Sequence, residues 1–170
     1  VDENKVILEK ILKYMEEEKV APYEEETHKG LLRHALIRKG FATGQLMVCL
    51  VINGKKLPAE DKLVQSLLEV EGMTSISVSV NTEKTNVIMG KEIRLLYGSE
   101  QIEDEIDGIT FKISPLSFYQ VNPVQTERIY SQALKYADLN GDETVWDLYC
   151  GIGTISLFLA RCAKHVYGVE

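Results

Sequence analysis

The sequence predicts an α/β fold in two parts, an α+β segment followed by the beginning of a parallel α/β sheet. Residues 1–114 contain short apolar runs separated by turn residues, as several strands require. From residue 115 onward the pattern changes to helix, strand, helix, strand, and the last three of these make one βαβ unit. Because one βαβ unit cannot cover both faces of a sheet, we expect residues 115–170 to be the N-terminal part of a domain truncated at its C-terminus.

Composition excludes several classes of protein. The chain has 170 residues, 45% of them hydrophobic, which is ordinary for a globular protein. No run approaches the roughly 20 apolar residues that span a bilayer, so we expect no membrane partner. The chain begins at Val1 rather than Met, which we interpret as the start of an excised segment. The formal net charge of −7 counts against an obvious nucleic-acid-binding surface.

The three cysteines, Cys49, Cys150 and Cys162, are widely spaced and odd in number. This pattern argues against both a disulfide framework and a zinc site, so we expect no metal and a cytoplasmic location. Since free cysteine is among the most buried residue types, each of the three is expected to be packed rather than reactive.

A helix opens the first segment, and strands dominate the rest of it. The helix is predicted by an apolar stripe at 3.6-residue spacing, which consists of Ile7, Leu8, Ile11, Leu12 and Met15. Strands are expected at 31–38 and at 46–52, and the second is apolar on both faces, as a central strand is. Residues 75–80 alternate serine with Ile or Val, which predicts one solvent-facing side. A short helix after Pro58 and further strands at 87–89, 92–97 and 109–113 complete the segment.

The second segment begins with a helix and continues with the βαβ unit. Asn122 can cap the helix, Pro123 suits its first turn, and Gln125 stands at a capping-box spacing. The buried stripe of this helix is expected to contain Ile129, Ala133, Leu134 and Ala137. The βαβ unit is then predicted as strand 144–149, helix 154–160 and strand 165–169.

The turn inside the βαβ unit is the strongest candidate for a ligand site. Asp147 precedes it, Gly151 and Gly153 lie in it, and Glu170 ends the second strand, at the sheet edge where α/β proteins bind ligands. Glycines let the backbone approach a ligand closely, and an acid at the second strand's end can accept hydrogen bonds from both ribose hydroxyls. A dinucleotide fingerprint requires Gly or Ala where this chain has Ser156.

The charge of the site also bears on its ligand. Asp147 suits a cationic ligand, such as a sulfonium that carries an ammonium group, better than a pyrophosphate. The alternative is a glycine-containing turn of an ordinary α/β protein. Upstream, the aromatic pair Phe118-Tyr119 and the amide of Gln120 stand next to a helix start and could form the lip of a binding site. The alternative there is a hydrophobic staple.

Three motifs together carry a resemblance: FYQVN at 118–122, DLYCGIG at 147–153 and GVE at 168–170. They resemble the RNA 5-methyluridine (uracil-C5) methyltransferase family, and most of all its bacterial 23S ribosomal RNA branch. Upstream, Leu32–His34 and Asn86–Gly90 resemble the central domain of the same family, so the resemblance extends over nearly the whole chain.

The resemblance implies a truncated Rossmann-like methyltransferase domain at 115–170, preceded by part of an α+β central, RNA-facing domain at 1–114. It implies S-adenosylmethionine as the cofactor. The implied partner is RNA, in particular ribosomal RNA, and not DNA. The resemblance implies no oligomeric state. The cofactor-binding residues that it implies are Gln120, Tyr149, Glu170, Asp147, Gly151 and Gly153. Some members carry Asn where this chain has Thr154.

The basic residues of the first strand are candidates for RNA contact, namely Arg33, His34, Arg38 and Lys39. The alternative for them is an ordinary half-exposed strand.

The family's mechanism implies a cysteine thiolate that adds to C6 of uracil, methyl transfer to C5, and a carboxylate base that removes the C5 proton before elimination. Both catalytic groups would lie beyond Glu170, and none of the three cysteines here matches the nucleophile's motif. We therefore assign no catalytic residue to this chain and expect it to be inactive alone. The alternatives are a methyltransferase of the same fold that acts on transfer RNA or a small molecule, and a non-catalytic RNA-binding fragment.

Overall fold

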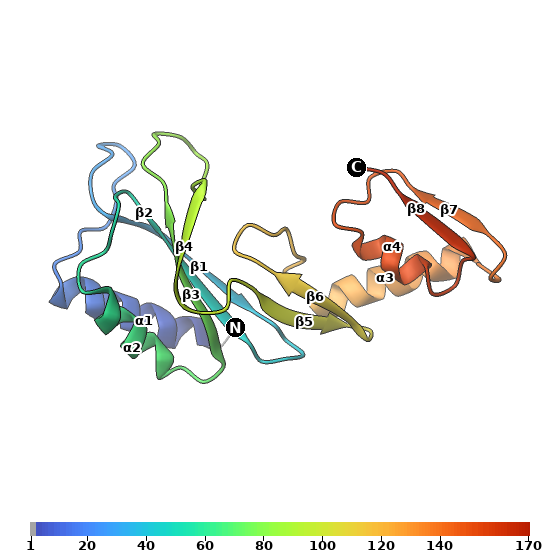
Figure 1. Cartoon of the computed structure of the whole chain (residues 1–170), viewed down its shortest axis with the longest axis horizontal. Helices are drawn as coiled ribbons and strands as arrows, with labels where there is room; N and C mark the ends of the chain where they lie inside the picture. Colours follow the sequence, from blue (N-terminus) through green and yellow to red (C-terminus); the bar gives the residue numbers. More distant parts are fainter. Residues whose placement is uncertain (1–2) are drawn as a thin grey trace. The chain divides into compact units, whose positions relative to one another are not determined.

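The computed structural model describes residues 3–170 and shows a mixed α/β protein, which confirms the predicted fold class (Figure 1). The chain divides into two compact units. Unit 1 contains the residues up to Glu105 together with Thr110–Phe118, and unit 2 contains Ile106–Ile109 and Tyr119–Glu170. Residue 115, where the sequence pattern changes, therefore lies in unit 1, and unit 2 resumes at Tyr119.

A four-stranded sheet forms the centre of unit 1. It contains β1 (Leu32–Lys39), β2 (Leu46–Ile52), β3 (Met73–Val80) and β4 (Glu92–Gly98), in the order β1-β2-β3-β4. β2 pairs antiparallel with β1 and parallel with β3, and β3 pairs antiparallel with β4. All seven residues of β2 are buried, so the prediction of a central strand is confirmed.

Two helices, α1 (Glu3–Glu17) and α2 (Glu60–Leu68), pack against one face of this sheet (Figure 1). α2 is the crossover between the parallel strands β2 and β3. Its side chains Leu63, Val64 and Leu67 are buried against the sheet, as the apolar spacing predicts.

The buried stripe of α1 differs from the predicted one. Ile7, Ile11 and Tyr14 are buried, whereas Leu8 and Leu12 are 45% and 58% exposed. The buried positions follow the spacing i, i+4, i+7, so the stripe is narrower than the apolar residues suggest. The two exposed leucines show that an apolar residue beside a stripe need not be part of it.

The serines of β3 are buried, which contradicts the predicted solvent-facing side. Ser75, Ser77 and Ser79 are 0%, 2% and 0% exposed. Ser77 lines a cavity of about 210 Å³ together with Pro115 and Leu116, and the Ser79 hydroxyl accepts a hydrogen bond from the backbone N–H of Gly90 at 2.9 Å. Small serine side chains fit beneath neighbouring segments of the chain, and alternation alone cannot distinguish this case from solvent exposure.

The predicted strand at 87–89 is instead part of a loop. Asn81 organises this loop, since its Nδ2 donates to the carbonyl oxygens of Val87 and Ile88 at 2.7 and 3.0 Å. The backbone groups that a strand would offer to a neighbour are thus bonded to a side chain, and the two apolar side chains are more than half exposed.

An additional strand, β5 (Ile102–Ile106), pairs with β6 (Ile109–Ile113). The connecting residues Asp107 and Gly108 both have positive φ, +49° and +73°, which is typical of a two-residue hairpin turn. β5 was not predicted because its sequence, IEDEI, has acids at three consecutive positions.

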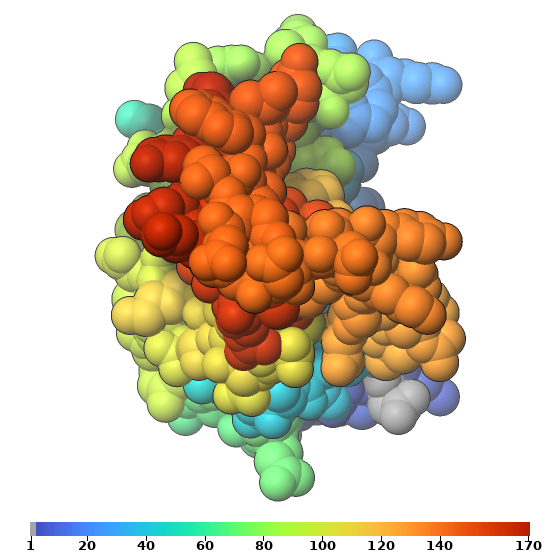
Figure 2. Space-filling view, turned by 90° about the vertical axis from the view of Figure 1, so that its right-hand side faces the viewer, coloured from blue at the N-terminus to red at the C-terminus, as the bar shows by residue number. Residues whose placement is uncertain are grey.

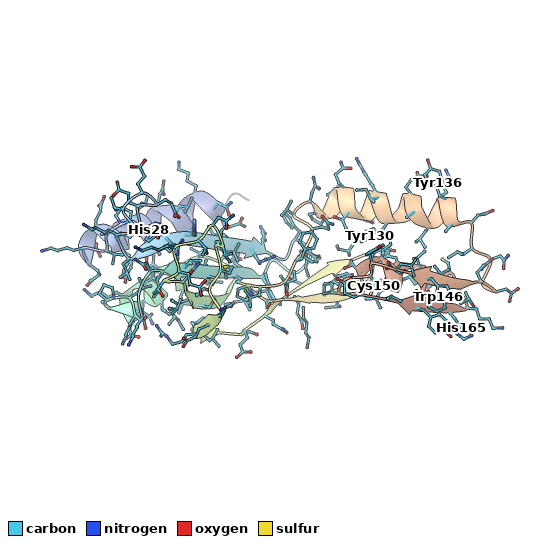
Figure 3. All side chains as sticks on the ribbon, turned by 90° about the horizontal axis from the view of Figure 1, so that it is seen from above. His28, Tyr130, Tyr136, Trp146, Cys150 and His165 are labelled. Carbon is cyan, nitrogen blue, oxygen red and sulfur yellow. The ribbon has the colours of Figure 1, made fainter. Side chains whose placement is uncertain are left out.

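Unit 2 contains the expected βαβ unit. β7 (Thr144–Asp147) and β8 (His165–Gly168) pair in parallel, and α4 (Thr154–Leu159) connects them. In Figure 3, α3 (Pro123–Ala137) lies along one side of this strand pair, and the labelled side chains of Trp146 and His165 lie on the other side. In Figure 2, the residues of the βαβ unit are drawn in orange and red.

The start of α3 is confirmed, and its predicted buried stripe is wrong at two of four positions. Asn122 is the N-cap, and its side chain accepts a hydrogen bond from the backbone N–H of Gln125 at 3.1 Å. Ile129 is 61% exposed and Ala137 is also exposed, although both were placed on the buried stripe. Thr126 is buried and the predicted Ala133 and Leu134 are half-buried, so two of the four predicted positions lie on the inward side of the helix.

Residues 3–170 offer neither a membrane-spanning helix nor a cluster of metal-binding side chains. No helix in this part of the chain is both long enough and apolar enough to cross a bilayer. No group of three or more His, Cys, Asp or Glu side chains there is arranged to hold a metal ion.

Candidate functional site

The candidate site is built around the turn between β7 and α4, residues 148–153, which we call the glycine turn. Gly151 and Gly153 have φ values of +55° and +83°, a region that other L-residues adopt at a cost of about 1–2 kcal/mol. A Cβ atom added at either glycine would meet no atom within 4 Å. The glycine turn therefore has open space beside its backbone, as a ligand cradle requires.

The end of β8 closes onto the glycine turn. The carboxylate Oε2 of Glu170 accepts a hydrogen bond from the backbone N–H of Gly151 at 2.8 Å. Two backbone bonds continue the contact, from Val169 N–H to the carbonyl of Asp147 at 2.8 Å and from Cys150 N–H to the carbonyl of Val169 at 3.1 Å. The acid at the end of the second strand thus lies at the turn, as the sequence pattern predicts.

Asp147, the last residue of β7, also has a side-chain partner. Its Oδ2 accepts a hydrogen bond from the hydroxyl of Ser156 at 2.7 Å. Ser156 lies one turn inside α4, so this bond crosses from the strand end to the helix. In the sequence, Ser156 argues only against a dinucleotide site. Its position at the start of the helix that follows the turn was the one feature that pointed to this contact.

The remaining predicted cofactor residues lie at two places in unit 2. The side chain of Tyr149, within the glycine turn, is 93% exposed. Gln120 lines a small pocket of about 130 Å³ at the start of α3, together with Asn122 and Tyr130. Hydrogen bonds thus join Asp147, Gly151 and Glu170 into one site, whereas Gln120 and Tyr149 are not part of that hydrogen-bonded set.

Tyr130 connects the two helices of unit 2. Its ring packs against Phe158 of α4 with ring centroids 5.0 Å apart, and Figure 3 shows it on the side of α3 that faces the strands. Burial raises the pKa of the Tyr130 hydroxyl, and a hydrogen bond with the side chain of Thr154 partly offsets that rise in pKa. Thr154 directly follows the glycine turn, so Tyr130 links the pocket of Gln120 to that turn.

The cysteines differ in exposure. Cys49 is fully buried in β2, and burial raises the pKa of its thiol, which makes it unsuited to nucleophilic attack. Cys150 is half-buried, and its Sγ would lie only 2.9 Å from a Cβ at Gly168, so it packs against the end of β8. Cys162 is exposed, so the expectation of a packed side chain is wrong there, because α4 ends at Leu159 and Cys162 lies in the exposed turn that follows.

Among the candidates for RNA contact, Arg33 is the most enclosed. Its side chain is 1% exposed, and its guanidinium stacks on the ring of Tyr23 at 4.3 Å from the centroid. Its Nη1 donates to the carbonyl oxygens of Asn81 and Glu83 at 3.0 and 2.9 Å. The guanidinium therefore holds the loop after β3.

The other three candidates lie farther along β1. The Nη2 of Arg38 donates to the carbonyl oxygens of Pro115 and Ser117 at 3.3 and 2.7 Å, and burial lowers its pKa. Lys39 pairs with Glu3 at 2.5 Å. Arg33, Arg38 and Lys39 thus each have partners inside unit 1, while His34 is half-buried on the same strand.

No protein-family model matches the chain. An uncharacterized RNA methyltransferase of Clostridium tetani is 54% identical over 163 residues, which cover 95% of this chain and 35% of that protein. An uncharacterized RNA methyltransferase of Halalkalibacterium halodurans is 48% identical over 170 residues, which cover 99% of this chain and 37% of that protein.

Among solved structures, the chain is similar to the Pyrococcus abyssi tRNA (uracil-54, C5)-methyltransferase in complex with S-adenosyl-L-homocysteine. The TM-score is 0.77 and the identity 30%, and the match covers 94% of this chain and 38% of that one. The chain thus spans between 35% and 38% of the proteins described. The names of these proteins support a place for the chain in the RNA methyltransferase family.

Proposed function

We propose that this chain holds part of the S-adenosylmethionine site of an RNA methyltransferase, and that the whole protein methylates C5 of uridine in RNA. The observation that carries the proposal is the joining of Asp147, Gly151 and Glu170 around one open glycine turn. The similarity of the chain to RNA methyltransferases supports the same conclusion.

The residues of the glycine turn fit the chemistry of this cofactor. The carboxylate of Glu170 is a suitable acceptor for the two ribose hydroxyls, because hydrogen bonds to an ionised acceptor are short and strong. Asp147 supplies a negative charge for the ammonium group of the methionine part. Gly151 and Gly153 leave room for the ligand beside the backbone, since a Cβ at either would lie in open space. Gln120 and Tyr149 are proposed as further contacts.

When bound, S-adenosylmethionine supplies an electrophilic methyl group. C5 of uracil is a poor nucleophile until a thiolate adds at C6, so the reaction needs a reactive cysteine. Cys49 is buried with a raised thiol pKa, and Cys150 packs at the turn itself. We therefore propose that the nucleophile and the base lie outside residues 1–170, and that this chain alone does not transfer methyl groups.

Ribosomal RNA, in particular 23S, is the substrate that we propose first, with transfer RNA as the second candidate. The resemblance of the motifs favours the ribosomal branch. The Pyrococcus abyssi protein described above, in contrast, is named as a transfer RNA methyltransferase. We propose the cytoplasm as the location and β1 as a strand that contacts RNA. Because Arg33, Arg38 and Lys39 already have partners in unit 1, direct contact is most accessible to His34.

The test is a methylation assay with the whole protein that carries this chain. The protein is incubated with methyl-labelled S-adenosylmethionine and, separately, with unmodified ribosomal and transfer RNA. The RNA is then digested, and the labelled nucleoside is identified by mass spectrometry. Label in 5-methyluridine from ribosomal RNA supports the proposal as stated, and label only from transfer RNA replaces the substrate.

Two other results would overturn the proposal. Label in a different nucleoside would remove the uracil-C5 chemistry. A folded protein that binds RNA but does not bind S-adenosylmethionine would remove the enzyme and leave a non-catalytic RNA-binding protein. In parallel, residues 1–170 are assayed alone, where methyl transfer would contradict the placement of the nucleophile.

A further inference from the structure

We propose that Ser156 is a positioning residue of the cofactor site, which acts through Asp147 on the amino-acid end of the ligand. This inference rests on the proposed function and adds a residue to its site. Neither the motifs nor the resemblance gives Ser156 a role, and the structure supplies the contact from which the role is inferred.

The bond between the two side chains spans the glycine turn. The hydroxyl of Ser156 donates to Oδ2 of Asp147 at 2.7 Å, and the pair is partly buried. Asp147 ends β7, and Ser156 is the third residue of α4, whose N-cap is Gly153. The bond therefore connects the two elements that flank the cradle, and it fixes the acid relative to the helix.

The surroundings of Ser156 fix the place of its hydroxyl. A Cβ at Gly168 would lie 3.6 Å from the Ser156 Oγ and 2.9 Å from the Sγ of Cys150. A larger residue at 168 would therefore have to displace Cys150, which lies at the edge of the same turn. The close approach of the β8 backbone therefore leaves room at position 156 for a small polar side chain, which lies beside the carboxyl ends of β7 and β8.

The effect on the ligand follows from the two oxygens of the Asp147 carboxylate, one of which accepts from Ser156. Ser156 donates to one oxygen of Asp147, which restricts rotation of the carboxylate and leaves the lone pairs of Oδ1 for another donor. Because a hydroxyl carries no charge, this bond brings no positive charge to Asp147, whereas a Lys or Arg partner would compensate the negative charge of the carboxylate. An ammonium group in the cradle then meets a fixed acceptor, and hydrogen bonds between two charged groups are about twice as strong as neutral ones.

Two nucleosides distinguish this role from general support of the fold. S-adenosylhomocysteine and 5′-methylthioadenosine share the adenosine and the thioether, but only the first has the ammonium group. Their dissociation constants are measured by calorimetry on the whole protein and on Ser156→Ala. We expect the variant to bind S-adenosylhomocysteine about tenfold more weakly, because an Asp147 carboxylate that Ser156 no longer holds bonds the ammonium group less well, and to bind 5′-methylthioadenosine unchanged.

Control variants complete the experiment. Ser156→Thr keeps the hydroxyl and is expected to restore binding, and Ser131→Ala removes an exposed hydroxyl on α3 without effect. In Asp147→Asn, the further change Ser156→Ala is expected to have a smaller effect than in the wild type, because the two residues act as a pair.

Three outcomes overturn the inference. Equal weakening of both nucleosides by Ser156→Ala would show support of the fold only, and unchanged binding of both would show no role. In either case the proposed function would stand, because the wild type binds. A folded wild-type protein that binds neither nucleoside would remove the proposed function and, with it, this inference.

Discussion

Glu170 accepts a hydrogen bond from the backbone N–H of Gly151 at 2.8 Å, so the end of β8 closes onto the turn that follows β7. This contact places the acid that we propose to hold the ribose directly against a glycine with a φ of +55°. The position of the carboxylate and the shape of the turn therefore depend on each other before any ligand binds.

Replacement of Glu170 by Gln tests the charge at this position. The amide oxygen can still accept from Gly151, but the ribose hydroxyls lose an ionised acceptor, whose hydrogen bonds are stronger than neutral ones. We expect the dissociation constant for S-adenosylhomocysteine to rise about tenfold, measured by calorimetry. Glu127→Gln, at an exposed acid on α3, is the matched control. Unchanged affinity in Glu170→Gln would show that the carboxylate does not hold the ligand.

The glycines of the turn can be tested against another glycine of unit 2. Gly153 and Gly141 have φ values of +83° and +100°, and a Cβ at either would meet no atom within 4 Å. An alanine at either position is expected to lower the free energy of unfolding by about 1–2 kcal/mol, because both backbones lie in the left-handed region. Urea denaturation measures this effect.

Only Gly153→Ala is expected to weaken the binding of S-adenosylhomocysteine as well, because its new Cβ would project into the cradle. Gly141 lies in the turn before β7 and serves as the control for backbone strain. An equal loss of affinity in both variants would mean that strain, rather than occupation of the cradle, is responsible.

The sequence predicted those parts of the fold that depend on one element. β2 could be recognised as central because all of its residues are apolar, and the cap of α3 because Asn122 and Pro123 stand together. The buried serines of β3 could not be predicted, because their neighbours lie farther along the chain, with Pro115 and Leu116 near Ser77 and Gly90 bonded to Ser79. β5 was missed because acids at its centre hide the strand pattern.

In the candidate site, too, some contacts could be predicted from the sequence and others could not. Asp147, Gly151 and Glu170 are joined around one turn because the carboxyl ends of parallel strands meet at the same edge of a sheet. The bond from Ser156 to Asp147 depends on the rotation of α4 about its axis, which the short sequence of that helix does not determine. For Arg33, the positive charge was visible in the sequence, but its backbone partners were not.

The role of Arg33 can be separated from direct RNA contact by a change that keeps the charge. Lys at this position cannot stack on Tyr23 and reach the carbonyls of Asn81 and Glu83 with the same planar fork. We expect Arg33→Lys to lower the free energy of unfolding by about 2 kcal/mol in urea denaturation. Arg128→Lys, at an exposed position of α3, should have no measurable effect. Weaker RNA binding with unchanged stability would instead assign Arg33 to the RNA surface.

Acid should weaken the packing of α2 against the sheet through Glu60. Its two carboxylate oxygens accept from the Nη2 and Nη1 of Arg94 at 2.5 and 2.9 Å, and this pairing lowers the pKa of Glu60 below its usual 4.5. A carboxyl whose folded-state pKa is lowered contributes stability above its unfolded-state pKa, and that contribution is lost as the pH falls through the folded-state value. Glu60→Gln should therefore be less stable than the wild type at neutral pH, and the difference should shrink below about pH 4.5. Urea denaturation at neutral pH and below about pH 4.5 measures this difference in the free energy of unfolding. Glu16→Gln, at an exposed acid of α1, is the control. A difference that stays constant with pH would mean that packing of the Glu60 side chain, rather than its charge, supports unit 1.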